Sequence, residues 1–486
     1  MPLRRHRCLK ALLCSALLSL TPSLAGQQAP AMVTTAKYLF VARGDWIFQY
    51  DVNTLALLGR AEIPAIDPAA KKPAGFGKLA RARRARRAGA EAVPTPRALR
   101  DLPDLPEPPE PPEPIISEPT IEEVALEEEP VSDRKKIRAG RQKRIQPIQA
   151  GLDWLAKHQD KDGRWDADRF MKHDEGQPST GPGSATHDVG VTGLAMLAML
   201  GESSTLTRGP YKANLKRAVA WLQSQQEDNG RFGTNAAHDF IYDHAIATFA
   251  ICEAYGLSQS KQLKSVAQSG INYLESHRNP YSVWRYQPRD NDNDISVTSW
   301  CLMACVSAKY WQLEVNQSAL DLGASYLDMV TTPDGRHGYT KGGERSSRLP
   351  GTHSEQFPNE KGEALTAAGL YCRLVLGQKP AQQPAIPRAA KLLAAKPPKW
   401  SKDEGTIDFY YWFYGTFAMS RMGGEDLRTW NEHLRAAVLV HQAQEGSASG
   451  SWDPVGVWGD IGGRVASTAL AVLSLEAYFR YNSLIR

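Results

Sequence analysis

The chain of 486 residues is long enough to hold a large core together with accessory segments. Hydrophobic residues make up 42% and charged residues 23%, which are ordinary proportions for a globular protein. The net charge of +5 is too small to indicate a nucleic acid partner by itself, and we expect none.

Residues 1–25 have the features of a secretory signal peptide. Three arginines come first, an apolar run follows, and a small-x-small cleavage site ends at Ala25. The alternative is an uncleaved N-terminal anchor. We therefore expect a protein that is exported to the periplasm or the cell envelope, with no membrane span in the mature chain.

Residues 33–64 are predicted to form a small β segment. The stretches YLFVA, IFQYD and ALLGRAEI have the pattern of three short strands, joined by Gly-Asp and Asn-Thr turns. They resemble one blade of a β-propeller, which has two open edges and little core of its own. We expect this blade to pack on the rest of the chain or to bind another protein of the cell envelope.

Residues 65–144 have the composition of a disordered linker. Basic residues are dense at 71–100, and residues 103–130 are rich in Pro and Glu. Such a sequence cannot bury a core and is expected to be extended. The basic block could bind anionic lipid, nucleic acid or an acidic polymer, but we interpret it as a solvated arm that pairs with its acidic neighbour.

Residues 145–486 repeat one motif six times. The first copy, GLDWLAKHQDKDGRW, ends at Trp165, and the second, AVAWLQSQQEDNGRF, ends at Phe232. Weaker copies end at Trp284, Tyr339, Trp400 and Trp452. Within a copy the apolar residues have helical spacing, and a Gly turn leads to an aromatic residue that can fold back over the helix end. A period of roughly 50–70 residues indicates a repeat architecture.

An apolar segment follows each copy, at 188–201, 241–256, 294–311, 362–377, 408–424 and 463–481. These segments are apolar on nearly every side and so predict buried helices. None reaches the roughly 20 uninterrupted apolar residues of a membrane span. Amphipathic and buried helices thus alternate, and we predict an all-α fold, a closed (α/α)6 toroid with the buried helices as its inner ring.

Two other residue types recur in the buried segments. We interpret the cysteines as buried core thiols, without disulfides or metal: Cys252, Cys301, Cys305 and Cys372. A threonine also recurs at the repeat period, and we assign it to helix packing rather than to catalysis: Thr192, Thr298, Thr366 and Thr468.

The motif small-x-x-aromatic-Leu-x-x-x-Gln-x-x-x-Gly-x-aromatic resembles the QW repeat of the prenyltransferase and squalene-cyclase superfamily. The first two copies match it well, whereas the third has Arg278 in place of the Gln and lacks the Gly. Segments such as DNDISVTSWCLMACVSAK also resemble exported bacterial proteins with a single toroid of this repeat. The resemblance covers about 340 of the 486 residues and implies the fold, while toroids host cyclases, transferases, lyases and binding domains alike.

Polar residues gather at the starts of the predicted inner helices, which meet at one end of a toroid. The free N–H groups at helix starts favour anions. Each carboxylate among these residues could also be a simple helix cap. We predict a ligand-binding group that comprises Asp188, Asp292, Glu363, Asp408, Tyr411 and Arg464.

The stretch Asp292-Asn293-Asp294-Ile295-Ser296 resembles the Asp-x-Asp-Asp-Thr-Ala motif of squalene–hopene-type cyclases. The resemblance implies that Asp294 is a general acid, which protonates an alkene or an epoxide. Ile295 stands where the motif has another Asp, so the usual activating pair is incomplete. A carboxyl group beside a hydrophobic residue can have a raised pKa. The alternative is that Asp294 is only the N-cap of its helix.

Asp243 and His244 are further catalytic candidates. Together with Asp239 they could bind a metal ion, because Asp239 and Asp243 share a helix face. The alternative is helix capping with buried hydrogen bonds, and we expect no metal. The sequence has no Asp-x-Cys zinc motif, no His-Glu-x-x-His, no Gly-x-Ser-x-Gly and no phosphate loop, so it predicts no cofactor.

The longest loop between helices, 334–359, is rich in glycine and basic residues, among them Arg336, Arg345 and Arg348. With Tyr410 and the tyrosine that follows it, this loop could hold an acidic or sugar ligand. Polysaccharide lyases of similar toroidal outline need a base and an arginine near an acidic sugar. The alternative is a solvated lid without a ligand.

Three functions therefore stay open. The first is a toroid that binds an apolar, isoprenoid-like ligand or a partner in its central cavity, with catalysis unproven; an apolar, aromatic-lined cavity would favour it. The second is a polysaccharide lyase or hydrolase at the cavity mouth, and a cleft with two carboxylates about 5–10 Å apart would favour a hydrolase. The third is a non-catalytic scaffold of the cell envelope, which a cavity plugged by its own side chains would favour.

Overall fold

The computed structural model describes residues 32–34, 38–43, 46–51, 57–62 and 146–479. The predicted signal peptide, 1–25, and the predicted linker, 65–144, lie outside these ranges. The N-terminal sheet and the C-terminal toroid are two separate units, and each is described by itself.

The N-terminal unit contains an antiparallel sheet of four strands, paired in the order β1-β2-β3-β4. The strands are β1 (Met32–Thr34), β2 (Tyr38–Arg43), β3 (Trp46–Asp51) and β4 (Leu57–Glu62). The last three are the strands that the sequence predicts. The sequence missed β1, because three residues are too few to show an alternating pattern. The result is a four-stranded meander, which is the make-up of one propeller blade.

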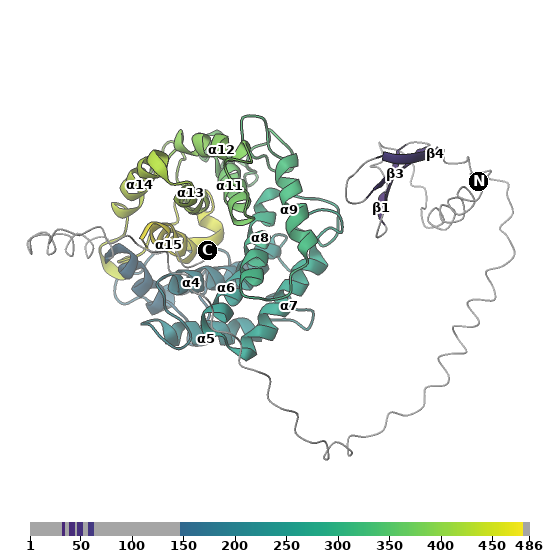
Figure 1. The fold of residues 1–486 in the computed structure, drawn as a ribbon. Coiled ribbons are helices and arrows are strands. Elements are labelled where there is room, and N and C mark those ends of the chain that lie inside the picture. Colours follow the sequence, from purple (N-terminus) through teal and green to yellow (C-terminus); the bar gives the residue numbers. More distant parts are fainter. Residues whose placement is uncertain (1–31, 35–37, 44–45, 52–56, 63–145, 480–486) are drawn as a thin grey trace, which may run out of the picture. The chain divides into compact units, whose positions relative to one another are not determined.

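Within residues 146–479, six helices form a closed inner ring (Figure 1). Each packs against the next, and the last packs back against the first. They are α4 (Asp188–Gly201), α6 (Phe240–Ser258), α8 (Ile295–Tyr310), α11 (Ala364–Val375), α13 (Phe409–Met422) and α15 (Gly459–Phe479), the last with a kink at Gly463. These helices occupy the predicted apolar segments, and nearly all of their described side chains are buried. The (α/α)6 toroid is therefore confirmed.

Six further helices of the described toroid surround this ring (Figure 1). They are the helix at 146–157, α5 (Lys212–Ser224), α7 (Lys261–His277), α9 (Gln317–Met329), α12 (Ala385–Ala394) and α14 (Gly424–Leu439). Their buried side chains follow helical spacing, as in α7, where Leu263, Ala267, Ile271 and Leu274 face inward. Short helices lie in the connections: η1 (Phe170–His173), η2 (Ala185–His187), α10 (His353–Gln356), η3 (Asn359–Lys361) and η4 (Gly446–Ala448). No helix of the described residues is long and apolar enough to cross a membrane.

In three copies the glutamine of the motif links one outer helix to the next. Its amide nitrogen donates both to the carbonyl of the glycine in its own turn and to a carbonyl in the following outer helix. The residues that do so are Gln159, Gln226 and Gln442, and the last reaches Pro147, which closes the outer ring. Arg278 replaces this amide in the third copy, where it donates to Ser282 and to Ser318 of α9.

The aromatic residue that ends a copy folds back over its helix, as predicted. The indoles of Trp165, Trp284 and Trp452 each donate to a carbonyl of the preceding outer helix. Their backbone N–H groups donate to a threonine of the inner helix, so the recurring threonine anchors the turn rather than taking part in chemistry. In the fourth copy His337 holds this place, because its N–H donates to Thr366. The prediction that Tyr339 ends this copy is therefore wrong by two residues.

Aromatic side chains pack across the interior of the inner ring. Trp300 of α8 stacks on Phe413 of α13 with 5.4 Å between ring centroids. Because α11 separates these two helices in the ring, the contact crosses the interior. Tyr414 packs edge-on against both rings, and Phe417 packs against Phe413. The predicted core cysteines are also free and buried: Cys252, Cys301, Cys305 and Cys372.

Candidate functional site

The starts of the inner helices lie at one end of the toroid, because all six pairs follow the same order of outer helix, loop and inner helix. Two of the loops that lead into them are long, 166–187 before α4 and 338–362 before α11. The predicted site residues come from these helix starts. The structure brings some of them together and separates others.

Asp294 is buried at the start of α8, with none of its surface exposed. It is the N-cap, since its Oδ1 accepts from the N–H of Val297 at 2.8 Å and from Ser296 Oγ at 2.8 Å. Its Oδ2 accepts no hydrogen bond from the described residues and lies 3.4 Å from Nε of Arg285. Burial raises the pKa of Asp294 to about 6. The residue is thus a cap and also a carboxyl group with one free oxygen.

Tyrosines from two helices and two loops lie near this carboxyl group: Tyr242 of α6, Tyr410 of α13, and Tyr286 and Tyr339 from loops. The hydroxyl of Tyr242 lies 2.5 Å from that of Ser296, and those of Tyr286 and Tyr339 lie 2.7 Å apart. The guanidinium group of Arg285 lies over both of the latter rings, 5.4 Å from each centroid. Arg285 is therefore held by two aromatic faces and by the charge of Asp294.

An open hollow of about 620 Å³ adjoins this cluster. Its lining includes three arginines and a tyrosine, which are Arg285, Arg345, Arg348 and Tyr339. Four hydroxyl side chains between residues 340 and 354 and the amide of Asn359 complete its polar wall. Arg285 and Tyr339 belong both to the hollow and to the Asp294 cluster. The hollow can therefore take a ligand that meets Arg285.

The hollow has an excess of positive charge. Among its described lining residues Glu344 is the single carboxylate, and it accepts from the N–H groups of Thr340 and Lys341. Arg348 forms no salt bridge within the described residues and donates instead to the carbonyl oxygen of Phe357 at 2.8 Å. Burial lowers the pKa of Arg348, although nearby carboxylates offset part of this effect. A ligand anion would supply a counter-charge that this arginine lacks.

Glu363, a predicted ligand-binding residue, is already fully paired. It is buried at the start of α11 and forms salt bridges with Arg336, Arg345 and Lys396 at 3.0–3.2 Å. Burial alone would raise its pKa, but these hydrogen bonds and charges outweigh burial and lower it. The cavity at this point holds only about 20 Å³, roughly the room for one water. Glu363 therefore organises the arginines and has no room for a ligand of its own.

Asp243 is paired with His187 and not with its neighbour in sequence, His244. His187 Nδ1, from the end of η2, lies 3.0 Å from Asp243 Oδ2, and its Nε2 lies 3.8 Å from Asp239 Oδ2. Gly190 leaves the space that Asp243 occupies, since a Cβ there would come within 2.2 Å of its Oδ1. Burial lowers the pKa of His187, yet the bond to Asp243 and the nearby carboxylates raise it overall. This dyad can hold a proton.

His244 lies apart from this dyad and has a structural role. Its Nδ1 accepts the N–H of Phe232 at 3.0 Å, so it takes the place that threonine holds in other repeats. Its Nε2 lies 3.2 Å from the carbonyl oxygen of Gly270 in α7. Burial lowers the pKa of His244 to about 3, which keeps the ring neutral. His244 is therefore bonded to Phe232 and Gly270, whereas the histidine beside Asp243 is His187.

The other predicted residues mostly support the fold. Asp408 caps α13 by accepting from the N–H of Tyr411, and the hydroxyl of Tyr411 donates to the carbonyl of Lys396. Arg464 is buried and donates to the carbonyl of Thr180, which links the sixth repeat to the first. Asp292 is exposed and lies 3.3 Å from Nη1 of Arg285.

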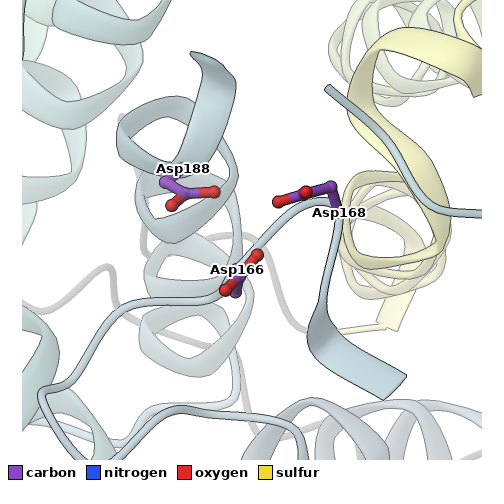
Figure 2. A group of neighbouring side chains, drawn as sticks. All are labelled: Asp166, Asp168 and Asp188. Atoms are coloured by element: carbon purple, nitrogen blue, oxygen red, sulfur yellow. The ribbon is translucent and has the colours of Figure 1, made fainter. Parts of the chain in front are cut away.

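Asp188 belongs to a cluster of three carboxylates with Asp166 and Asp168. Figure 2 shows that the three groups turn toward one another, and their oxygen atoms lie within 4.8 Å. Such oxygens could hold a divalent cation. However, Lys172 lies 2.8 Å from Asp166 Oδ2, and Arg164 lies 3.1 Å from Asp188 Oδ2. These two cations already supply counter-charge. Burial raises the pKa of Asp188 to about 6.

No family model and no curated protein matches the chain. The comparison with solved structures does find proteins with a similar fold. An inactive variant of an α-1,6-mannanase from Salegentibacter in complex with α-1,6-mannotriose is 10% identical, with a TM-score of 0.46; the match covers 69% of this chain and 98% of that one. A variant of a type II terpene cyclase from Scytonema in complex with its product is 16% identical, with a TM-score of 0.44, over 69% and 96%. An α-amylase from Clostridium perfringens is 12% identical, with a TM-score of 0.46, over 68% and 97%. At these values the comparison carries no information on the chemistry of this chain.

Sequence reasoning missed three residues of the Asp294 cluster. Arg285 and Tyr286 follow the closing Trp284 directly, and Tyr339 lies two residues after His337. All three lie just after the turn that ends a repeat, close to the start of α8. There the N–H of Ile295 donates to the carbonyl of Tyr339. Position after the closing aromatic residue is the signal that could have found them.

Proposed function

We propose that this protein binds an acidic, hydroxyl-rich ligand, of the kind that an acidic oligosaccharide offers, at the end of the toroid where the inner helices begin. The observation that carries the proposal is the hollow of about 620 Å³ with Arg285, Arg345 and Arg348 in its wall. Arginine binds carboxylate and sulfate groups through paired N–H donors in a fixed plane.

The aromatic side chains that pack across the ring favour a ligand site at this end of the toroid over one at its centre. An isoprenoid-like ligand inside the ring would have to displace the stacked pair Trp300 and Phe413. These side chains are at most 3% exposed, and interiors that are packed in this way lose stability when they are opened. The hollow, in contrast, is open and needs no displacement of core side chains.

The charges of the wall favour an acidic ligand. Arg345 shares the single charge of Glu363 with Arg336 and Lys396, and of these three cations Arg336 also pairs with Asp334. Arg348 adds a charge that no salt bridge of the described residues offsets, and the carboxylate of Glu344 is held by backbone N–H groups. Hydroxyl and amide side chains with Tyr339 at the rim can hydrogen-bond the hydroxyl groups of a sugar.

Binding is a narrower claim than hydrolysis. Two-carboxylate glycoside hydrolysis needs an acid and a second carboxylate about 5–10 Å apart across one bond. The described lining of the hollow contains one carboxylate, Glu344. The other group of carboxylates, Asp166, Asp168 and Asp188, has oxygen atoms within 4.8 Å of one another, which is less than this separation, and Lys172 and Arg164 already pair with it. A scaffold without a ligand is the second candidate, because aromatic side chains packed across the ring are also expected in a protein that binds nothing at its centre. We further propose action in the periplasm or cell envelope, which rests on the predicted signal peptide.

The test is calorimetric titration of the full mature chain with trigalacturonate and, separately, with the neutral trisaccharide maltotriose. We expect saturable binding of the acidic sugar that weakens at high salt, and much weaker binding of the neutral one. Arg345→Gln should reduce the affinity about tenfold, the loss of one charge-assisted contact. The matched control is Arg428→Gln, which removes the same charge from an exposed position on α14 and should bind like the wild type. Equal binding of both sugars, or none of either, would contradict the proposal.

A further inference from the structure

Arg285 connects the hollow to the buried carboxyl group of Asp294. Arg285 is part of the lining of the hollow, its Nη1 lies 3.3 Å from the exposed Asp292, and its Nε lies 3.4 Å from Asp294 Oδ2. Nε makes no hydrogen bond within the described residues. The arginine is therefore held by a hydrogen bond to Asp292, by the charge of Asp294 and by the two tyrosine faces, and an anion in the hollow would compete for it.

Asp294 has no second partner that could replace Arg285. Its Oδ1 is used by the cap, and Oδ2 meets no donor among the described residues. The groups near it are one arginine, one exposed carboxylate and several hydroxyl groups: Arg285, Asp292, Ser296, Tyr242, Tyr286, Tyr326, Tyr339 and Tyr410. A carboxylate without exposure and without a cation is too costly to keep, and such a group takes up a proton instead.

We propose that an acidic ligand in the hollow draws Arg285 away from Asp294, and that Asp294 takes up one proton from the solvent as the ligand binds. The proton resides on Oδ2, and no other bond forms or breaks. This inference rests on the proposed function, since it requires an anion in the hollow. It assigns Asp294 a role in proton-coupled binding and Arg285 the role of coupling residue.

The coupling predicts the direction of the pH dependence. With Arg285 in place, the pKa of Asp294 is about 6, so the free protein is mostly ionised at pH 7. Loss of the arginine raises this pKa further, because its positive charge favours the ionised form. Affinity should therefore rise as the pH falls toward about 6, and uptake should vanish well below that pH, where the free protein already carries the proton.

The test is titration with trigalacturonate at pH 7 in buffers of different ionisation enthalpy, which gives the number of protons taken up. The full mature chain should take up roughly 0.4 proton at pH 7, the change in protonation when a pKa of about 6 rises by about one unit. Asp294→Asn should still bind, because asparagine keeps the N-cap, but without uptake and with an affinity that does not change between pH 6 and pH 8. Arg285→Gln should also lose the uptake and should bind more weakly.

The matched control is Glu253→Gln. Glu253 is a second buried carboxyl group of raised pKa, and it accepts a hydrogen bond from Ser307. It lies near the C-terminal end of α6, away from the helix starts, so this variant should take up as many protons on binding as the wild type. On addition of ligand, wild-type protein should gain a protonated-carboxyl infrared band that Asp294→Asn lacks, and this readout does not depend on the affinity of the variant. Binding by the wild type without uptake would overturn the coupling alone. Absence of binding would overturn the proposed function, and the coupling with it.

Discussion

Asp294 and Glu363 are two buried carboxyl groups at the starts of inner helices, and they have opposite properties. Asp294 faces one cation, Arg285, and burial raises its pKa to about 6. Glu363 faces three cations, and its pKa is lowered despite burial. The comparison shows that burial alone does not decide the charge of such a group. The number of donors that reach its oxygens does, and only the group with a free oxygen can respond to a ligand.

The largest expected effect is on the pH dependence of stability. The pKa of Asp294 is higher in the folded than in the unfolded chain, so the folded state binds more protons between about pH 4 and pH 6. Its contribution to stability therefore falls as the pH rises through this window, by about 3 kcal/mol for a shift of about two pKa units. Glu363 has the opposite sign: its lowered pKa adds stability that is lost as the pH falls below about 4.5.

Denaturant unfolding of wild type and Asp294→Asn from pH 4 to pH 8 measures this effect. The difference between the two free energies of unfolding should change with pH in favour of the variant as the pH rises. Other buried carboxyl groups contribute equally to both proteins and so cancel. A difference that is independent of pH would show that Asp294 is not the group that titrates.

The second effect is the loss of stability when Glu363, the carboxyl group that faces three cations, loses its charge. Glu363→Gln removes the charge that Arg336, Arg345 and Lys396 share, and we expect a loss of about 2 kcal/mol in the free energy of unfolding at pH 7. This value is below the usual cost of breaking a buried pair, because the three cations are partly exposed and water can solvate them. Asp294→Asn at the same pH should cost nothing or stabilise the chain. Equal losses in both variants would break the comparison.

The smallest expected effect is the change in the pKa of each carboxyl group when one neighbouring arginine is removed. Arg285→Gln should raise the pKa of Asp294 by about one unit, since it removes the one cation that the described residues place beside it. Arg345→Gln leaves Glu363 with two cations, so its pKa should stay below 4.5. Infrared titration of the carboxyl band, with Asp294→Asn and Glu363→Gln as blanks, measures both values. A larger shift at Glu363 than at Asp294 would contradict the account.

The sequence predicted the toroid because its signals are local. A glutamine, a glycine and an aromatic residue lie within one short turn, and their hydrogen bonds repeat from copy to copy, as at Gln159 and Gln226. The apolar segments gave the inner helices for the same reason. The fourth copy was misaligned because a buried histidine, His337, stands where other copies have an aromatic ring of the core.

The site could be predicted only in part. Asp294 and Asp243 were found, since helix starts can be read from the sequence. Their partners Arg285 and His187 were not assigned to them, because these side chains arrive from loops whose paths depend on tertiary packing. Asp243 and His244 are neighbours in sequence, yet neighbours on a helix point to different faces, and the two side chains have different partners. The hollow itself has no signature in the sequence beyond the basic loop that forms its wall.

The most direct test of the central claim is a crystal structure of the protein soaked with trigalacturonate. The account predicts density for the sugar in the hollow, with its carboxylates on Arg345 and Arg348 and with Arg285 turned from Asp294 toward the ligand. Density for an apolar ligand inside the ring between α8 and α13, with the hollow empty, would contradict it.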